Sequence, residues 1–466
     1  MQLTKKQFWL FLGSLLLVAA LTFSLTFLFA RRAAPEPEIR YVPVEYPAID
    51  GVPDNYRELC AALRLYSYYG LPDDVDYAGL LARTIVASTG DPYAEYFTAE
   101  EYAAYRADLD GVYKGIGVTI DAVQTDDGEP AIRMLAVFAG SGAETAGLMP
   151  GDLVIAIDGE SVSALGGPNA ALERIRGEEG TTVTLTVLRR DETQTEYTRL
   201  ECTVTRSDCQ KQTVFWNLLD LADGQKIAYI RITAFNPMTL DEFVTAVEAA
   251  EAANASGLVF DLRYNGGGYL DTVAQMLAYL LPDGDISHIR YGTETLKSGD
   301  YTIRAENGKM MNVLASDGTV TEVHSSLTPE KISHEVHVPL AVLVNGSTAS
   351  AAELFTSALR DYANDEAYPD FPKVTIVGSN TYGKGCMQRP FRLSDDSYLK
   401  VTVALYDPPS GVNYHGLGIA PTDNYATEAN DTRVGDLYLK ASEGATTLPD
   451  GKDDTVLIRA LAAFTR

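Results

Sequence analysis

The order of apolar segments between residues 217 and 422 constrains the fold more than any other feature of the sequence. In this zone IAYIRIT precedes the amphipathic run LDEFVTAVEAAEAA, and the apolar run GLVFDLR precedes LDTVAQMLAYLL. Further along, PLAVLVN leads into ASAAELFTSAL, and VTIVG and LKVTVALY follow. Because short apolar runs alternate with longer runs of helical spacing, the zone predicts βαβ units and an α/β fold.

Other parts of the chain have a different pattern of apolar and polar residues. Short alternating runs such as VTIDAV, LVIAID and TVTLTVLRR, separated by Gly and Asp turns, predict a small β domain with one helix, PNAALERIRG. At 466 residues the chain exceeds what one hydrophobic core usually organises. We therefore predict seven segments: an amino terminus at 1–7, a membrane span at 8–30, a Pro-rich tether at 31–55, a helical segment at 56–109, the β domain at 110–206, the α/β core at 207–425 and an acidic, partly helical tail at 426–466.

The run from Phe8 to Ala30 contains 23 residues without a charge. As a helix it would span roughly 35 Å, which is enough to cross a bilayer. A cleaved signal peptide is the alternative, but its apolar region is usually only about 7–15 residues long. The flanking charges are nearly balanced, with Lys5 and Lys6 before the run and Arg31 and Arg32 after it, so they leave the orientation open.

Net charge and cysteine pattern exclude several classes of partner. The 37 Lys and Arg residues against 64 Asp and Glu leave a net charge of −27, and such a surface repels phosphate backbones, so we expect no nucleic acid partner. The four cysteines form no CxxC pair and no metal-ligand spacing, and we expect no metal or cofactor. Cys202 and Cys209 could bridge in an oxidising compartment, although unpaired buried thiols are the favoured interpretation.

One candidate reactive residue lies in the run NGSTASAAE, residues 345–353, between the apolar PLAVLV and a helical run. A sharp strand-to-helix turn is expected there. A serine in such a turn can face a reacting group, and backbone N–H groups at the start of the helix can stabilise an oxyanion. The structural alternative is that Ser350 only caps the helix, because Ser350-Ala-Ala-Glu353 matches the capping box S-x-x-E.

A second candidate is Lys384 in TYGKGCMQ, residues 381–388, which stands between two glycines in a strongly acidic chain. Lysine accepts a proton from serine only when neutral, so its pKa would have to fall from ~10.4 toward neutrality through burial. If a strand runs through this stretch, Lys384, Cys386 and Gln388 share one face, and the Gln388 amide could orient the lysine amine. An ordinary turn lysine is the alternative.

A third candidate is the glycine triplet in DLRYNGGG, residues 261–268, which follows the apolar run GLVF. Glycines allow the backbone to approach a ligand and expose N–H groups, as an oxyanion hole requires. A nucleotide-binding loop is disfavoured because the GK[ST] ending is missing, and a plain tight turn is the remaining alternative.

In this order the three blocks resemble those of the C-terminal processing, or tail-specific, peptidases, a serine-protease family with a Ser-Lys dyad. The resemblance covers residues 56–422. It extends to DPYAEYF at 91–97, GIGV at 115–118, the PDZ-like run SGAETAGLMPGDLVIAIDG at 141–159 and GLGIAP at 416–421. The chain departs from the family pattern at Tyr264, Gly266 and Ala352. Of these departures, Gly266 leaves the identity of the oxyanion donor open.

The resemblance implies both a fold and roles for individual residues. The fold would be a multi-domain α/β protein with a crotonase-like β/α protease core, an inserted PDZ-like domain, a helical N-terminal segment and one transmembrane helix. Ser350 would be the nucleophile, Lys384 the general base and Gln388 its orienting partner, with oxyanion donors at Gly267 and Ala351. In the PDZ-like domain the backbone of Gly115, Ile116, Gly117 and Val118 would capture a peptide's terminal carboxylate.

The resulting prediction is a serine endopeptidase that cleaves unfolded or C-terminally exposed proteins, with the PDZ-like domain recognising the substrate and gating the site. The family also implies an extracytoplasmic catalytic domain, a cytoplasmic amino terminus and a homodimer. The main alternative is a catalytically silent PDZ scaffold that binds partner proteins. A histidine-based hydrolase would need a motif such as GxSxG around its serine, and the chain has none.

Overall fold

The computed structural model describes residues 63, 75–138, 140–190, 196–221, 223–325, 327, 335–427, 437 and 453–464. The chain divides into two compact units, one formed by residues up to 99 together with 390–401, and the other by residues 100–389 and 402–466. No helix among the described residues has the length and apolar character needed to cross a membrane. The predicted span at 8–30 and the predicted tether at 31–55 lie outside the described residues.

The centre of the larger unit is a five-stranded sheet in the order β10-β11-β12-β17-β18. Its strands are β10 (Val214–Asp220), β11 (Lys226–Ile232), β12 (Gly257–Asp261), β17 (Leu340–Val344) and β18 (Val374–Gly378). Only β10 is antiparallel to its neighbour. Every residue of β12, β17 and β18 is buried, as expected for parallel strands covered on both faces. The predicted α/β fold is confirmed.

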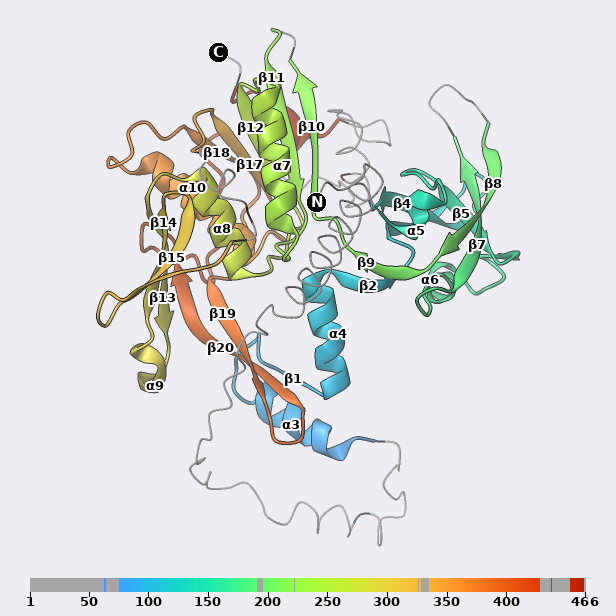
Figure 1. The fold of residues 1–466 in the computed structure, drawn as a ribbon, viewed down its shortest axis with the longest axis horizontal. Coiled ribbons are helices and arrows are strands. Elements are labelled where there is room, and N and C mark those ends of the chain that lie inside the picture. Colours follow the sequence, from blue (N-terminus) through green and yellow to red (C-terminus); the bar gives the residue numbers. More distant parts are fainter. Residues whose placement is uncertain are drawn as a thin grey trace, which may run out of the picture. The chain divides into compact units, whose positions relative to one another are not determined.

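Helices cover both faces of this sheet, and Figure 1 shows α7, α8 and α10 beside it. On one face, α7 (Thr239–Ala252) and α10 (Ala351–Asn364) contribute Phe243 and Phe355, whose rings pack around Phe260 of β12, and α8 (Leu270–Leu280) packs against both helices. On the other face, α12 (Thr455–Leu461) packs its apolar side against Val259 and neighbouring strand residues. The sheet is therefore the middle layer of three, and its carboxyl edge carries the loops after β12, β17 and β18.

A second sheet of the same unit contains β13 (Gly284–Tyr291), β14 (Tyr301–Glu306), β15 (Lys309–Leu314) and β16 (Val320–Glu322) in sequence order, with the short helix α9 (Glu294–Lys297) between β13 and β14. The carboxyl half of β20 (Tyr398–Asp407) pairs with β13, and β19 (Cys386–Arg392) pairs with β20. The strand predicted from TYGKGCMQ therefore begins at Cys386, after Lys384, and Lys384 lies in the loop that precedes it.

Residues 118–205 form a separate antiparallel sheet in the order β3-β4-β5-β7-β8, with its own buried core. Its elements are β3 (Val118–Gln124), β4 (Pro130–Val137), β5 (Leu153–Ile157), β6 (Glu160–Ser161), β7 (Thr182–Arg189), β8 (Thr198–Thr205), α5 (Gly142–Thr145) and α6 (Pro168–Ile175). A two-stranded ribbon of β2 (Val112–Gly115) and β9 (Ser207–Gln210) precedes and follows it in the chain. Strand β3 is an edge of the sheet.

The smaller unit contains α3 (Tyr77–Ala87) and β1 (Glu95–Phe97), which pairs with the amino-terminal residues of β20. Helix α4 (Ala99–Asp110) follows β1 in the chain. The predicted helical segment thus contains two described helices separated by a short strand. Cys202, Cys209 and Cys386 are free thiols, so the bridge considered between Cys202 and Cys209 is not formed.

Candidate active site

Ser350 lies in the turn between β17 and α10 with an unusual backbone conformation. Its φ is 58° and its ψ is −122°, values that non-glycine residues rarely adopt and that often mark functional sites. Neighbouring bonds hold the turn in place: the Ala349 N–H donates to the Asn265 carbonyl oxygen at 2.9 Å, and the Thr348 hydroxyl donates to the Leu262 carbonyl oxygen at 2.9 Å. The predicted sharp strand-to-helix turn is confirmed, and it is attached to the glycine loop.

Glu353 connects the Ser350 turn to the Lys384 loop. Its fully buried carboxylate accepts the Ser350 N–H at 2.9 Å, which is the Glu-to-cap hydrogen bond expected of a capping box. The same carboxylate accepts the Gly383 N–H at 2.7 Å, the Lys384 N–H at 2.7 Å and the Thr381 hydroxyl at 2.5 Å. One side chain therefore fixes the main chain of Ser350 and of Lys384 together, although 34 positions separate them in the sequence.

Tyr406 of β20 forms a second connection between the same two residues. Its hydroxyl donates to the Lys384 carbonyl oxygen at 2.7 Å and lies 3.2 Å from Ser350 Oγ. Burial raises the pKa of this hydroxyl, so it stays protonated across the ordinary pH range. The Tyr406 hydroxyl therefore lies within hydrogen-bond reach of both the Lys384 main chain and the Ser350 side chain.

The remaining predicted partner of the lysine, Gln388, lies in β19. Its side-chain amide donates to the Cys386 carbonyl oxygen at 3.3 Å, contacts Cys386 Sγ at 3.3 Å and donates to the Thr402 hydroxyl at 3.2 Å. The contact with Cys386 Sγ fits the predicted shared face of Cys386 and Gln388. The orienting role of Gln388 toward Lys384 stays a prediction.

The glycine loop lies directly against Ser350. Gly267 has a φ of +104°, and a Cβ built on it would stand 2.7 Å from Ser350 Cβ and 3.0 Å from the Ala351 nitrogen. Its N–H donates to Asn265 Oδ1 at 2.9 Å. Ala351 is buried at the first position of α10, where the amino end of the helix favours negative charge. The two predicted oxyanion donors thus come from loops that touch each other.

Arg263 holds the glycine loop in place through buried ion pairs. Its guanidinium, 1% exposed, binds Asp261 and donates to both carboxylate oxygens of Asp454 at 2.9 and 2.8 Å. Burial alone would lower the pKa of Arg263, but the two carboxylates raise it well above its ordinary value. Asp454 is also the N-cap of α12, so the C-terminal helix is tied to the loop beside Ser350.

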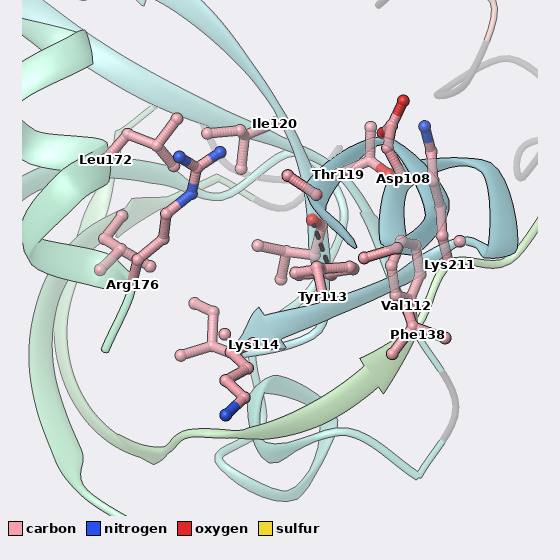
Figure 2. Close-up of a pocket in the computed structure, with 17 residues that line it drawn as sticks. Asp108, Val112, Tyr113, Lys114, Thr119, Ile120, Phe138, Leu172, Arg176 and Lys211 are labelled. Atoms are coloured by element: carbon pink, nitrogen blue, oxygen red, sulfur yellow. Dashed lines mark hydrogen bonds between the residues drawn. The ribbon is translucent and has the colours of Figure 1, made fainter. Parts of the chain in front are cut away.

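A groove of about 500 Å³ lies beside the edge strand β3 (Figure 2). The predicted carboxylate-binding residues Gly115, Ile116 and Val118 line it, and Gly117 stands between them with a φ of +83°. The positive φ lets the backbone turn sharply beside the groove, and binding of a carboxylate by the N–H groups of this turn stays a prediction. The rest of the lining is mainly apolar with a few basic groups, including Ile120, Phe138, Leu172, Ile175, Lys114, Arg176 and Lys211.

The positions of Glu353 and Tyr406 beside Ser350 were not predicted from the sequence. Glu353 was recognised only as a helix-capping partner, and the capping box was the one signal that pointed to it. Tyr406 lies in the predicted strand LKVTVALY, and nothing in the local pattern distinguishes it from a core tyrosine.

Two protein-family models match parts of this chain. The model of peptidase family S41 matches residues 226–425, and the PDZ domain model matches residues 135–189. The carboxyl-terminal-processing protease of Synechocystis sp. is 32% identical over 339 residues, which cover 73% of this chain and 69% of that protein. The carboxy-terminal processing protease CtpA of Bacillus subtilis is 29% identical over 355 residues, which cover 76% of this chain and 65% of that protein.

Among solved structures, an S41 protease structure from Bacteroides fragilis superposes with a TM-score of 0.55 at 19% identity, covering 91% of this chain and all of that one, which supports the fold alone. Fold and sequence together define a serine-type peptidase with a PDZ domain. The chain belongs to peptidase family S41, among the carboxyl-terminal processing proteases.

Proposed function

We propose that this chain hydrolyses peptide bonds through an acyl-enzyme on Ser350, with Lys384 as the general base. The observation that carries this proposal is the buried Glu353 carboxylate, which binds the backbone N–H groups of both Ser350 and Lys384. A shared anchor of this kind keeps two segments in register, as nucleophile and base require. Gln388, which follows Lys384 by four positions, is the proposed partner of the lysine amine.

In the first half of the reaction, Ser350 Oγ attacks the substrate carbonyl carbon while its proton passes to the neutral Lys384 amine. The resulting oxyanion is stabilised by backbone N–H groups, for which Ala351 and Gly267 are the proposed donors. Because the Gly267 N–H bonds Asn265 in this structure, that bond must be exchanged for one to the oxyanion. Lys384 then gives its proton to the leaving amine, and water repeats the sequence to release the acyl group.

The proposed substrates are unfolded proteins or proteins with exposed C-termini. Supporting this, the nest at Gly115–Val118 adjoins an apolar groove, and an extended peptide could pair with β3 while its terminal carboxylate binds the nest. Such capture could also align the catalytic loops. The Tyr382 N–H donates to the Thr348 carbonyl oxygen at 3.0 Å in the Ser350 turn, and the exposed Tyr382 side chain would favour apolar segments of an unfolded chain.

We further propose that residues 8–30 anchor the enzyme in a membrane, with the amino terminus in the cytoplasm and the catalytic domain outside it. The support is the uncharged run itself and the family to which the chain belongs. A homodimer is proposed on the family resemblance.

The catalytic proposal is tested with Ser350→Ala and Lys384→Ala. Both variants should lose cleavage of a denatured protein by at least about 10³-fold, because nucleophile and base act as one unit. Cleavage is followed by gel and mass spectrometry, and thermal unfolding verifies that each variant is folded. Full activity in either folded variant would contradict the dyad.

A further inference from the structure

Tyr113 occupies a position in the peptide groove that the proposed mechanism does not use. It lies in β2, two residues before the nest, and its ring packs edge-on against Phe138 with the ring centres 6.2 Å apart. Its hydroxyl donates to the Val118 carbonyl oxygen at 3.2 Å, the dashed contact in Figure 2. The side chain is thus directed into the groove and fixed there by a specific hydrogen bond.

The acceptor of this bond belongs to the open edge of the sheet. Phe138 N–H donates to the Gly117 carbonyl oxygen at 2.9 Å, so the backbone groups of Gly117 face β4. Backbone groups alternate in direction along a strand, and those of Val118 therefore face away from β4, toward the groove. Because Val118 is the last residue of the nest and the first of β3, its carbonyl is the edge acceptor closest to a captured carboxylate.

We propose that Tyr113 sets the affinity of the groove for C-terminal peptides by holding the Val118 carbonyl oxygen until a peptide displaces it. This inference rests on the proposed function of the groove. A peptide strand added to β3 needs that oxygen for the N–H group nearest its terminal carboxylate. When the peptide takes it, the partly buried tyrosine hydroxyl loses its acceptor, and this loss opposes binding.

The consequence is a threshold for recognition. A peptide that offers only a terminal carboxylate gains little, since it must first replace an existing hydrogen bond. A longer extended segment that pairs along β3 and fills the apolar lining offsets the loss. The hydroxyl therefore raises the interaction free energy that any C-terminus must supply before it binds, and extended segments can supply it by pairing along β3.

The test is to remove the hydroxyl and measure peptide affinity. Full-length Ser350→Ala protein in detergent binds the peptide without cleaving it. The probe is a fluorescein-labelled ten-residue peptide with a free C-terminal valine, and the same peptide with a C-terminal amide reports dependence on the carboxylate. Fluorescence anisotropy gives Kd for Ser350→Ala alone and combined with Tyr113→Phe. The matched control adds Tyr368→Phe, whose hydroxyl donates to the Asp283 carbonyl oxygen at 3.1 Å outside the groove.

We expect Tyr113→Phe to bind the free-acid peptide on the order of 2- to 10-fold more tightly, the range for one net hydrogen bond, with Tyr368→Phe unchanged. Carboxylate-dependent binding that is equal or weaker in Tyr113→Phe would overturn the inference alone, and weaker binding would mean that the hydroxyl contacts the peptide. If neither protein prefers the free acid to the amide, the proposed recognition of C-termini fails and the inference fails with it.

Discussion

Glu353 accepts four hydrogen bonds in a fully buried position, two on each carboxylate oxygen. A buried carboxylate is stable only when such donors replace the water it has lost. The arrangement makes Glu353 a positioning residue, because it binds the backbone of Ser350 and Lys384.

Glu353→Gln should lower kcat by about 10- to 100-fold, because the amide NH2 group would face two of these donors in either orientation, and at least one of the two comes from the Lys384 loop. Each lost charged bond should also reduce the free energy of unfolding by about 1.5–3 kcal/mol. Glu242→Gln is the control, since the partly buried Glu242 carboxylate accepts three bonds from Thr213 and Val214. That control should lose stability with kcat nearly unchanged. Unchanged kcat in Glu353→Gln would refute the positioning role.

Alanine substitutions at the adjacent residues Gly267 and Gly266 give a second comparison of a test variant with a control. Gly267→Ala should reduce kcat/KM by about 10²-fold, because the new methyl group would meet Ser350 Cβ at 2.7 Å and the backbone has a positive φ. Gly266→Ala should keep most activity, since nothing lies within 4 Å of its added Cβ. Steady-state kinetics on one peptide substrate compare the two, and equal losses would count against the close approach of Gly267 to the nucleophile.

At the scale of elements, the tie between α12 and the glycine loop is the least expected feature. Arg263 and Asp454 are both nearly fully buried and lie 191 positions apart. Removing the Asp454 charge would weaken two charged hydrogen bonds and leave the buried Arg263 with Asp261 as its remaining carboxylate partner, which is more costly than losing an exposed ion pair.

Asp454→Asn keeps a residue that can cap α12 but removes the charge opposite Arg263. We expect a loss of about 3–5 kcal/mol in unfolding free energy, measured by urea denaturation. Glu173→Gln removes an exposed ion pair with Arg176 and should cost less than about 1 kcal/mol. Similar small losses in both variants would argue against a structural role for the buried pair.

Features set by the local sequence pattern could be predicted from the sequence, and features set by contacts between distant residues could not. The buried parallel strands were predictable, because a strand covered on both faces needs an unbroken apolar run such as LAVLV. The turn at Ser350 was predictable because a capping box followed that strand. Tyr406, Tyr113 and Asp454 were not, since each acts through a partner brought near only by tertiary folding. Lys384 was placed on a strand that in fact begins two residues later, at Cys386.

At the scale of the whole molecule, the proposed anchor at 8–30 predicts that the full chain stays with the membrane and that a chain without the anchor does not. The full chain should stay in the membrane pellet after alkaline carbonate extraction, which strips peripheral proteins but leaves spanning helices. A chain lacking residues 1–55 should appear in the supernatant and still cleave a denatured protein. Recovery of the full-length chain in the carbonate supernatant would contradict the anchor, and a shortened chain in that fraction would point to a cleaved signal peptide.

The most direct test of the central claim is to identify the acylated residue. The enzyme is mixed with a slowly deacylating 4-nitrophenyl ester of a short peptide, quenched in acid, digested and analysed by mass spectrometry. The proposed mechanism predicts the acyl mass on the fragment that contains Ser350 and on no other, and its absence in Ser350→Ala. Acylation of a different residue, or undiminished peptide hydrolysis by Ser350→Ala, would contradict it.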